Sequence, residues 1–169
     1  MKEAILSWLY PNFCVHCQAL HKEESLLCHA CSEHIEWIEP SYEGTIQGAL
    51  LVPCGPIMSL VHHKTQTERV TKALGALFVI GLARYTWPMP DYVMASPYLE
   101  TFGLAKAVAR WIDRPLVSTH IWHRRRLGRA RNKSVLLIDT VLRSDIECSL
   151  KRLSLRDWRL LALLPNEKT

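Results

Sequence analysis

Four cysteines near the start of the chain are spaced as ligands of a metal ion. Cys14 and Cys17 form one Cys-x-x-Cys pair, and Cys28 and Cys31 form a second pair after ten intervening residues. Each pair predicts a tight turn that points two thiolates at one ion, so the two pairs together suit one tetrahedral zinc. Four thiolates leave no open position for water or substrate, which predicts a structural site. Metal binding would also supply folding energy that a module of about forty residues can hardly obtain from an apolar core.

Two disulfides are the alternative for these cysteines. Residues 1–13 show no basic stretch leading into an apolar run of adequate length, as a secreted chain would. Cysteines separated by two residues are also awkward disulfide partners for each other. We therefore expect zinc. The sequence places four histidines around the cysteines, one of which could replace a cysteine ligand: His16, His21, His29 and His34.

A second candidate for chemistry follows the strand predicted at 134–139. Its continuous apolar side chains predict burial on both faces, as in the middle of a parallel sheet. In such a sheet, ligands bind beyond the carboxyl ends of the strands. The turn after this strand offers polar and charged side chains for that purpose: Asp139, Thr140, Arg143, Ser144 and Asp145.

The segments that would position these residues alternate between helical and strand patterns. Apolar residues recur at helical spacing from Thr67 to the proline-rich stretch at 87–90, and again over 98–112 and 147–155. The inner stripe of the helix at 98–112 is expected to be Phe102, Ala105, Val108, Ala109 and Ile112. Short apolar runs predict strands at 92–95, 115–117 and 158–164, whereas Pro53, Gly55 and Pro56 predict a turn. This alternation predicts an α/β domain at 41–169 after a zinc ribbon at 1–40.

The chain resembles the ComF family of competence-associated proteins. The resemblance lies in the order of its features: two cysteine pairs, then a long helix, then the Val-Leu-Leu-Ile-Asp strand at 135–139. That family joins an N-terminal zinc ribbon to a phosphoribosyltransferase-type domain. The apolar lead-in at 6–11, the Tyr-Glu-Gly at 42–44 and His63-Lys64 are also similar to family landmarks. The resemblance implies a Rossmann-like parallel sheet with helices on both faces. It also implies an accessory role in DNA uptake, with single-stranded DNA and competence-machinery proteins as partners.

The strand-end turn departs from the phosphoribosyltransferase pattern. Such enzymes carry two consecutive acids, which hold ribose hydroxyls, and then a Thr-Thr-Gly-type turn whose backbone N–H groups cradle a phosphate. Here Asp139 keeps the first acid, Thr140 replaces the second, and Asp145 puts a carboxylate where a phosphate should sit. We therefore expect a degenerate, non-catalytic domain. The alternatives are a working phosphoribosyltransferase that uses magnesium and phosphoribosyl diphosphate, with Arg143 and Ser144 at the phosphate, and a zinc-ribbon module for protein interaction.

Positive charge is concentrated before the predicted central strand. The chain has a formal net charge of +5, and the block at 124–133 contains no acidic residue. Such a block could contact the phosphates of nucleic acid, although it could equally be a solvated loop. Its charged residues are Arg124, Arg125, Arg126, Arg129, Arg131 and Lys133.

Composition limits the class of protein. Hydrophobic residues make up 49% of the chain and charged residues 22%, which predicts a core-forming globular protein and not a disordered one. No apolar stretch approaches the roughly 20 residues needed to cross a bilayer. We therefore expect a cytoplasmic protein.

Overall fold

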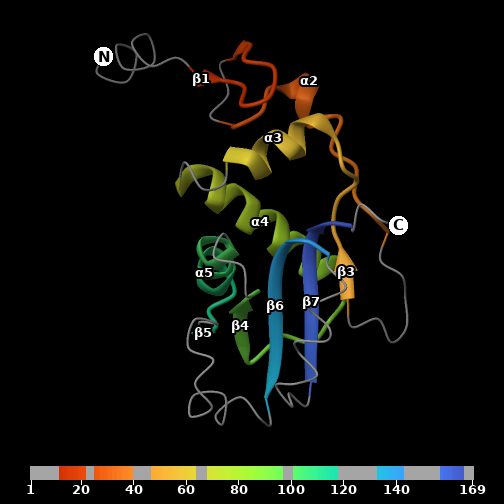
Figure 1. Cartoon of the computed structure of the whole chain (residues 1–169), viewed down its shortest axis with the longest axis vertical. Coiled ribbons are helices and arrows are strands. Elements are labelled where there is room, and N and C mark those ends of the chain that lie inside the picture. Colours follow the sequence, from red (N-terminus) through yellow and green to blue (C-terminus); the bar gives the residue numbers. More distant parts are fainter. Residues whose placement is uncertain are drawn as a thin grey trace.

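The computed structural model describes residues 12–21, 25–39, 47–63, 68–96, 101–117, 133–142 and 157–165. Within these ranges the chain forms a small cysteine-bearing ribbon and a five-stranded parallel sheet with helices. Figure 1 shows the ribbon at one end of the molecule, helix α3 beneath it, and the sheet at the other end. The predicted α/β class with an N-terminal ribbon is confirmed.

The sheet has the strand order β3-β7-β6-β4-β5, and all of its pairings are parallel. The central strand β6 (Ser134–Val141) pairs with β7 (Asp157–Leu164) on one side and β4 (Tyr92–Ala95) on the other. The edges are β3 (Gln47–Ala49) and β5 (Leu116–Val117). The strands expected at 92–95, 115–117, 134–139 and 158–164 are therefore present.

Strand β6 is buried on both faces, as its apolar run predicted. Leu136 and Ile138 pack toward the helices, in one cluster with residues of α3, α4 and α5. Val135 and Leu137 belong to a separate buried cluster with Met94 and Leu160, on the opposite face. The chain segments that connect β5 to β6 and β6 to β7, with the helix expected at 147–155, lie outside the described residues.

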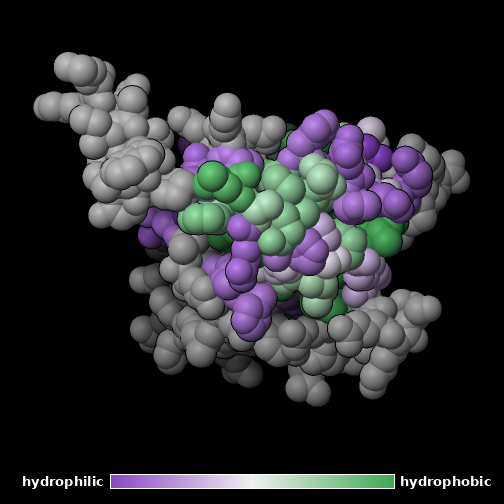
Figure 2. Space-filling view, turned by 90° about the horizontal axis from the view of Figure 1, so that it is seen from above, coloured by the Kyte–Doolittle hydropathy of each residue, from purple (hydrophilic) through white to green (hydrophobic). Residues whose placement is uncertain are grey.

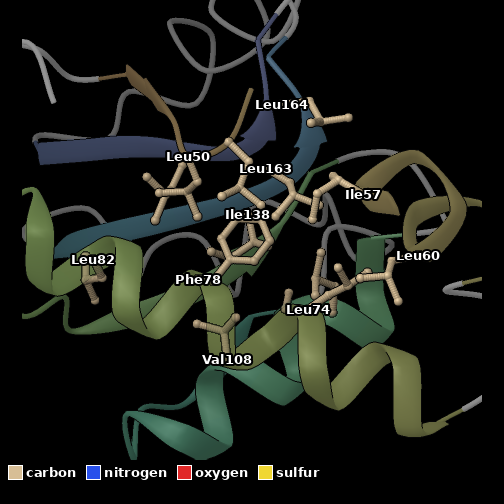
Figure 3. Packing of buried hydrophobic residues seen from close by; sticks show 14 of the residues in the cluster. Leu50, Ile57, Leu60, Leu74, Phe78, Leu82, Val108, Ile138, Leu163 and Leu164 are labelled. Carbon is tan, nitrogen blue, oxygen red and sulfur yellow. The ribbon is translucent and has the colours of Figure 1, made fainter. Parts of the chain in front are cut away.

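Three helices cover the first of these faces. They are α3 (Gly55–His63), α4 (Glu68–Arg84) and α5 (Phe102–Trp111). Phe78 of α4 is fully buried at the centre of this core, and Figure 3 shows its ring between Ile138 and Leu163 of the sheet and Val108 of α5. The periodic apolar residues at 70–82 thus form the helix they predicted.

The chain does not continue as a strand past Pro53, as predicted, but the sequence did not predict helix α3, which begins at Gly55. Proline is tolerated in the first turn of a helix, where its missing N–H would have no intrahelical partner. Pro56, Ile57 and Leu60 are buried along this helix. Pro56 therefore starts a helix here and does not end a strand.

Phe102 was also misplaced by the sequence prediction. It is 36% exposed at the first residue of α5, and the buried stripe of that helix begins at Leu104. Ala105, Val108 and Ala109 are buried as expected. The register of α5 against the sheet therefore turns Phe102 away from the core.

Helix α4 passes close to Leu50, the residue that follows β3, at a position where an added Cβ atom would clash. A Cβ atom built on Gly81 would lie 2.8 Å from Cδ1 of Leu50, whose side chain is itself buried. We expect Gly81→Ala to lower the free energy of unfolding by about 1–3 kcal/mol, because Leu50 has no free space to move into. Urea unfolding would measure this. The matched control is Gly103→Ala, where the added Cβ meets only Thr71 at 3.6 Å, and equal stability of both variants would contradict the prediction.

Candidate functional site

Each cysteine pair lies in a short backbone turn of the ribbon. Cys14 follows strand β1 (Asn12–Phe13), which pairs antiparallel with β2 (Leu20–His21). The Cys14 carbonyl accepts the N–H of Gln18 at 3.0 Å, which closes the first turn. The second pair brackets the start of α2 (His29–Ser32), where the Cys28 carbonyl accepts the N–H of Ser32 at 3.0 Å. Two local turns therefore present all four sulfur atoms.

The four sulfur atoms converge on one point. Those of Cys14, Cys17, Cys28 and Cys31 all lie within 4.8 Å of one another, and the sulfurs of Cys17 and Cys28 are 3.7 Å apart. A zinc–sulfur bond of about 2.3 Å places the sulfurs of a tetrahedral site about 3.8 Å apart. None of the four cysteines forms a disulfide. The cluster therefore fits a structural zinc ion, as the spacing predicted.

Proton affinity differs sharply among these thiols when no metal is bound. Burial raises the pKa of Cys14, but N–H groups of Cys17, Cys28 and His16 hydrogen-bond its sulfur and lower the pKa to about 6. Burial and hydrogen bonds from the neighbouring cysteines raise the pKa of Cys31 to about 12. The backbone thus favours the thiolate form of Cys14, whereas the thiolate form of Cys31 requires a nearby cation. Zinc supplies that charge and displaces the remaining protons.

The ribbon packs directly on α3. Cys14, Leu27 and Cys31 belong to the same buried cluster as Ile57 and Leu60 of that helix. The metal centre therefore shares its apolar surroundings with the core of the α/β domain.

A polar contact joins the same two elements. The Nδ1 atom of His16 lies 2.9 Å from the hydroxyl of Ser59. Gly55 leaves room for this imidazole, since a Cβ there would lie 2.7 Å from its Cε1 atom. His16 thus contacts α3 and is not a member of the metal-binding cluster, which contains only cysteines among the described residues.

The chain leaving the ribbon pairs with the segment that precedes α3. The N–H of Ile38 donates to the Leu50 carbonyl at 2.8 Å, and the N–H of Val52 donates to the Glu36 carbonyl at 2.9 Å. Between them, Trp37 and Leu51 form an antiparallel bridge. Residues 36–38 thus bond to the segment after β3, across the domain boundary predicted at residue 40.

The second site lies where the connections of the sheet change direction. From β4 the chain passes through α5 to β5 on one side, whereas β6 flanks β4 on the other side. In open parallel sheets this switch point, at the carboxyl ends of the strands, is where ligands bind. Buried polar side chains of the described chain gather there: Ser96, Thr101, Asp139 and Thr140.

Hydrogen bonds join these polar residues across the two strands. The N–H of Ser96 donates to the Ile138 carbonyl at 3.0 Å, which places Ser96 beside Asp139. The hydroxyls of Ser96 and Thr101 lie 3.2 Å apart. Neither Ser96 nor Thr101 was predicted as a site residue. The parallel register of β4 and β6, which brings Ser96 beside Asp139, is not visible in local sequence.

The carboxylate of Asp139 is turned inward. Its side chain is 0% exposed, and Oδ1 accepts the N–H of Thr140 at 2.6 Å. Thr140 is also buried. The remaining residues predicted for this turn, Arg143, Ser144 and Asp145, lie outside the described residues.

The basic block is represented in the structure by Lys133 alone, since Arg124, Arg125, Arg126, Arg129 and Arg131 lie outside the described residues. Lys133 precedes β6, and its Nζ atom lies 3.9 Å from a carboxylate oxygen of Asp91. Asp91 also accepts the Ser134 N–H at 2.9 Å, and that bond helps to lower its pKa. Lys133 lies six residues before Asp139 of β6, and a strand rises about 3.3 Å per residue. The two residues are therefore about 20 Å apart, near opposite ends of the strand.

Comparison with known families supports the metal site. Residues 5–42 match the model of the double zinc ribbon domain, a stretch that contains Cys14, Cys17, Cys28 and Cys31. Four cysteines are one ligand set for one tetrahedral zinc. Searches of curated proteins and of solved structures gave no match. Among the helices described, none has the length and apolarity of a membrane span.

Proposed function

We propose that this chain is a ComF-like accessory protein of DNA uptake, acting in the cytoplasm. Its zinc ribbon and basic block would meet single-stranded DNA or competence-machinery proteins. Its phosphoribosyltransferase-like domain would serve as a scaffold without transferring phosphoribosyl groups.

The observation that carries the proposal is the burial of the Asp139 carboxylate near the end of β6. A carboxylate that holds ribose hydroxyls must offer its oxygens to the ligand, whereas Asp139 is fully buried and accepts the N–H of Thr140. The neighbouring position holds a threonine in place of a second acid, and that threonine is buried as well. The sequence adds Asp145 to the turn, a charge that opposes phosphate binding.

Calorimetric titration with phosphoribosyl diphosphate and magnesium tests the loss of chemistry. We expect no saturable heat up to millimolar ligand, since Asp139 and Thr140 offer no exposed oxygens and Asp145 repels the phosphate. Measuring one zinc per chain in the same sample ensures that the protein is folded. Saturable binding that Asp139→Asn abolishes would instead establish the enzyme alternative.

Binding of labelled single-stranded DNA across a salt series tests the basic block. Contacts between arginines and phosphates release counterions, so affinity is expected to fall steeply as salt rises. Replacing Arg124, Arg125 and Arg126 by alanine is expected to weaken binding and to reduce the slope of log affinity against log salt by about 2. A slope that the triple variant leaves unchanged would contradict a role for this block.

One observation favours the protein-interaction module as a second candidate. Phe13 and Leu20 lie opposite each other in the β1–β2 pair and are 57% and 66% exposed. Figure 2 views the molecule from above, and apolar side chains there lie among hydrophilic ones. Salt-independent DNA binding, or none, would favour this candidate. Replacing Phe13 and Leu20 by serine should then abolish partner binding without loss of zinc.

A further inference from the structure

A groove lies between helices α4 and α5, away from both sites described above. Its volume is about 470 Å³, within the range of small-ligand sites in proteins. Three cationic side chains line it, Lys72 from α4 and Lys106 and Arg110 from α5. Lys106 and Arg110 are four residues apart and therefore share one face of the helix.

Charge in this groove is arranged for an anion. Its one carboxylate, Glu68, lies 3.1 Å from the Nζ atom of Lys72. That hydrogen bond is the main reason why the pKa of Glu68 is lowered, and the charges of Lys72, Arg110 and Lys106 lower it further. With three cations and one anion, the lining has an excess positive charge of two at neutral pH.

An aromatic side chain completes the lining. Trp111, the last residue of α5, is 60% exposed, although an indole of this size normally buries most of its surface. Cations beside an exposed aromatic plane are the combination that binds single-stranded nucleic acid, where bases stack and phosphates pair with charge. An acidic peptide would satisfy the cations but would leave the indole without a stacking partner.

Gly103 keeps the groove open. It is the second residue of α5, and a Cβ built there would meet only Cγ2 of Thr71 at an ordinary 3.6 Å. In contrast, Gly75 and Gly81 of α4 are required by close neighbours. Packing does not explain glycine at position 103, where another residue would favour the helix. A larger side chain there would fill the groove.

We propose that this groove binds a nucleotide unit, with its base stacked on Trp111 and its phosphate held by Lys106 and Arg110. A free nucleotide and a nucleotide within a single strand offer the same chemistry, and the experiment below distinguishes them. The site does not depend on the proposed role in DNA uptake. It is also separate from the strand-end turn that follows Asp139.

The test uses two probes, labelled octadeoxythymidylate followed by anisotropy and dAMP followed by calorimetry. Both are measured in the full chain and in the variant with Arg124, Arg125 and Arg126 replaced by alanine, which weakens binding by the basic block. We expect Gly103→Leu to weaken binding at least tenfold without changing any charge. Trp111→Ala should weaken it about tenfold. Arg110→Ala should also weaken it, whereas the matched control Arg114→Ala, an exposed arginine outside the groove lining, should not.

Each outcome decides the proposal. Binding of dAMP that Gly103→Leu weakens identifies a free nucleotide as the source. Binding of the octamer alone, weakened in the same way, identifies a single strand. The proposal is overturned if Gly103→Leu binds both probes like the parent, or if the triple arginine variant binds neither. In that last case, DNA binding through the basic block would still stand.

Discussion

Replacing Cys31 by serine is expected to abolish zinc binding and to destabilise the α/β domain together with the ribbon. Three thiolates and a hydroxyl are a poor ligand set for zinc, and structural zinc contributes on the order of 10 kcal/mol to the folding of small modules. The effect should extend beyond the ribbon, because Cys31 and Cys14 share one buried cluster with Ile57 and Leu60 of α3. Metal content and urea unfolding followed by circular dichroism would measure both effects.

The matched control for this prediction is Cys54→Ser. Cys54 is partly buried against the same core but is not one of the four clustered sulfurs. We expect this variant to keep one zinc per chain and most of its stability. A Cys31→Ser protein with the zinc content and unfolding midpoint of the parent would contradict the prediction, because Cys31 would then not be a ligand of a structural metal.

Phe78→Ala is expected to lower the free energy of unfolding by about 3–5 kcal/mol. The ring is fully buried where α4 meets the sheet, and it contacts a core to which three helices and the central strands contribute (Figure 3). Removing the ring leaves a cavity. The surrounding helices and strands cannot close it, because each of them is held in place by other neighbours. Equilibrium unfolding in urea would give the value.

Ile80→Ala on the same helix is the control for Phe78→Ala. Ile80 is half exposed, so its truncation removes little buried surface and should cost less than about 1 kcal/mol. Similar losses for both variants would contradict the position of Phe78 at the centre of the core.

Elements whose signal is local were predictable from sequence. Strand β6 was recognised because four consecutive apolar residues, 135–138, lie between polar neighbours, and α4 because its apolar residues recur at helical spacing. The metal centre was equally local, since each pair of cysteines lies within one turn. These features depend on residues close in sequence, whose types determine the backbone they adopt.

Features that depend on distant residues were missed. Helix α3 follows Pro53, and its burial depends on contacts with the ribbon and α4 that no local pattern encodes. Ser96 lies beside Asp139 only through the register of β4 against β6, and Thr101 contacts Ser96. Phe102 was assigned to the inner stripe because it fits the helical spacing of the apolar residues, although the start of α5 leaves it at the surface. In each case the outcome was determined by tertiary packing and not by the conformational preference of the local sequence.

The pairing of residues 36–38 with 50–52 determines how this protein can be divided into fragments. A truncation that starts at residue 41 would expose the Val52 amide and the Leu50 carbonyl. It would also remove the Trp37 ring, over which Arg84 lies at 5.2 Å. A shortened version intended to work without the ribbon should therefore retain residues 36–39. The peptide that carries the cysteines then ends near residue 35, which is after its last metal ligand, Cys31, and before the domain boundary predicted at residue 40.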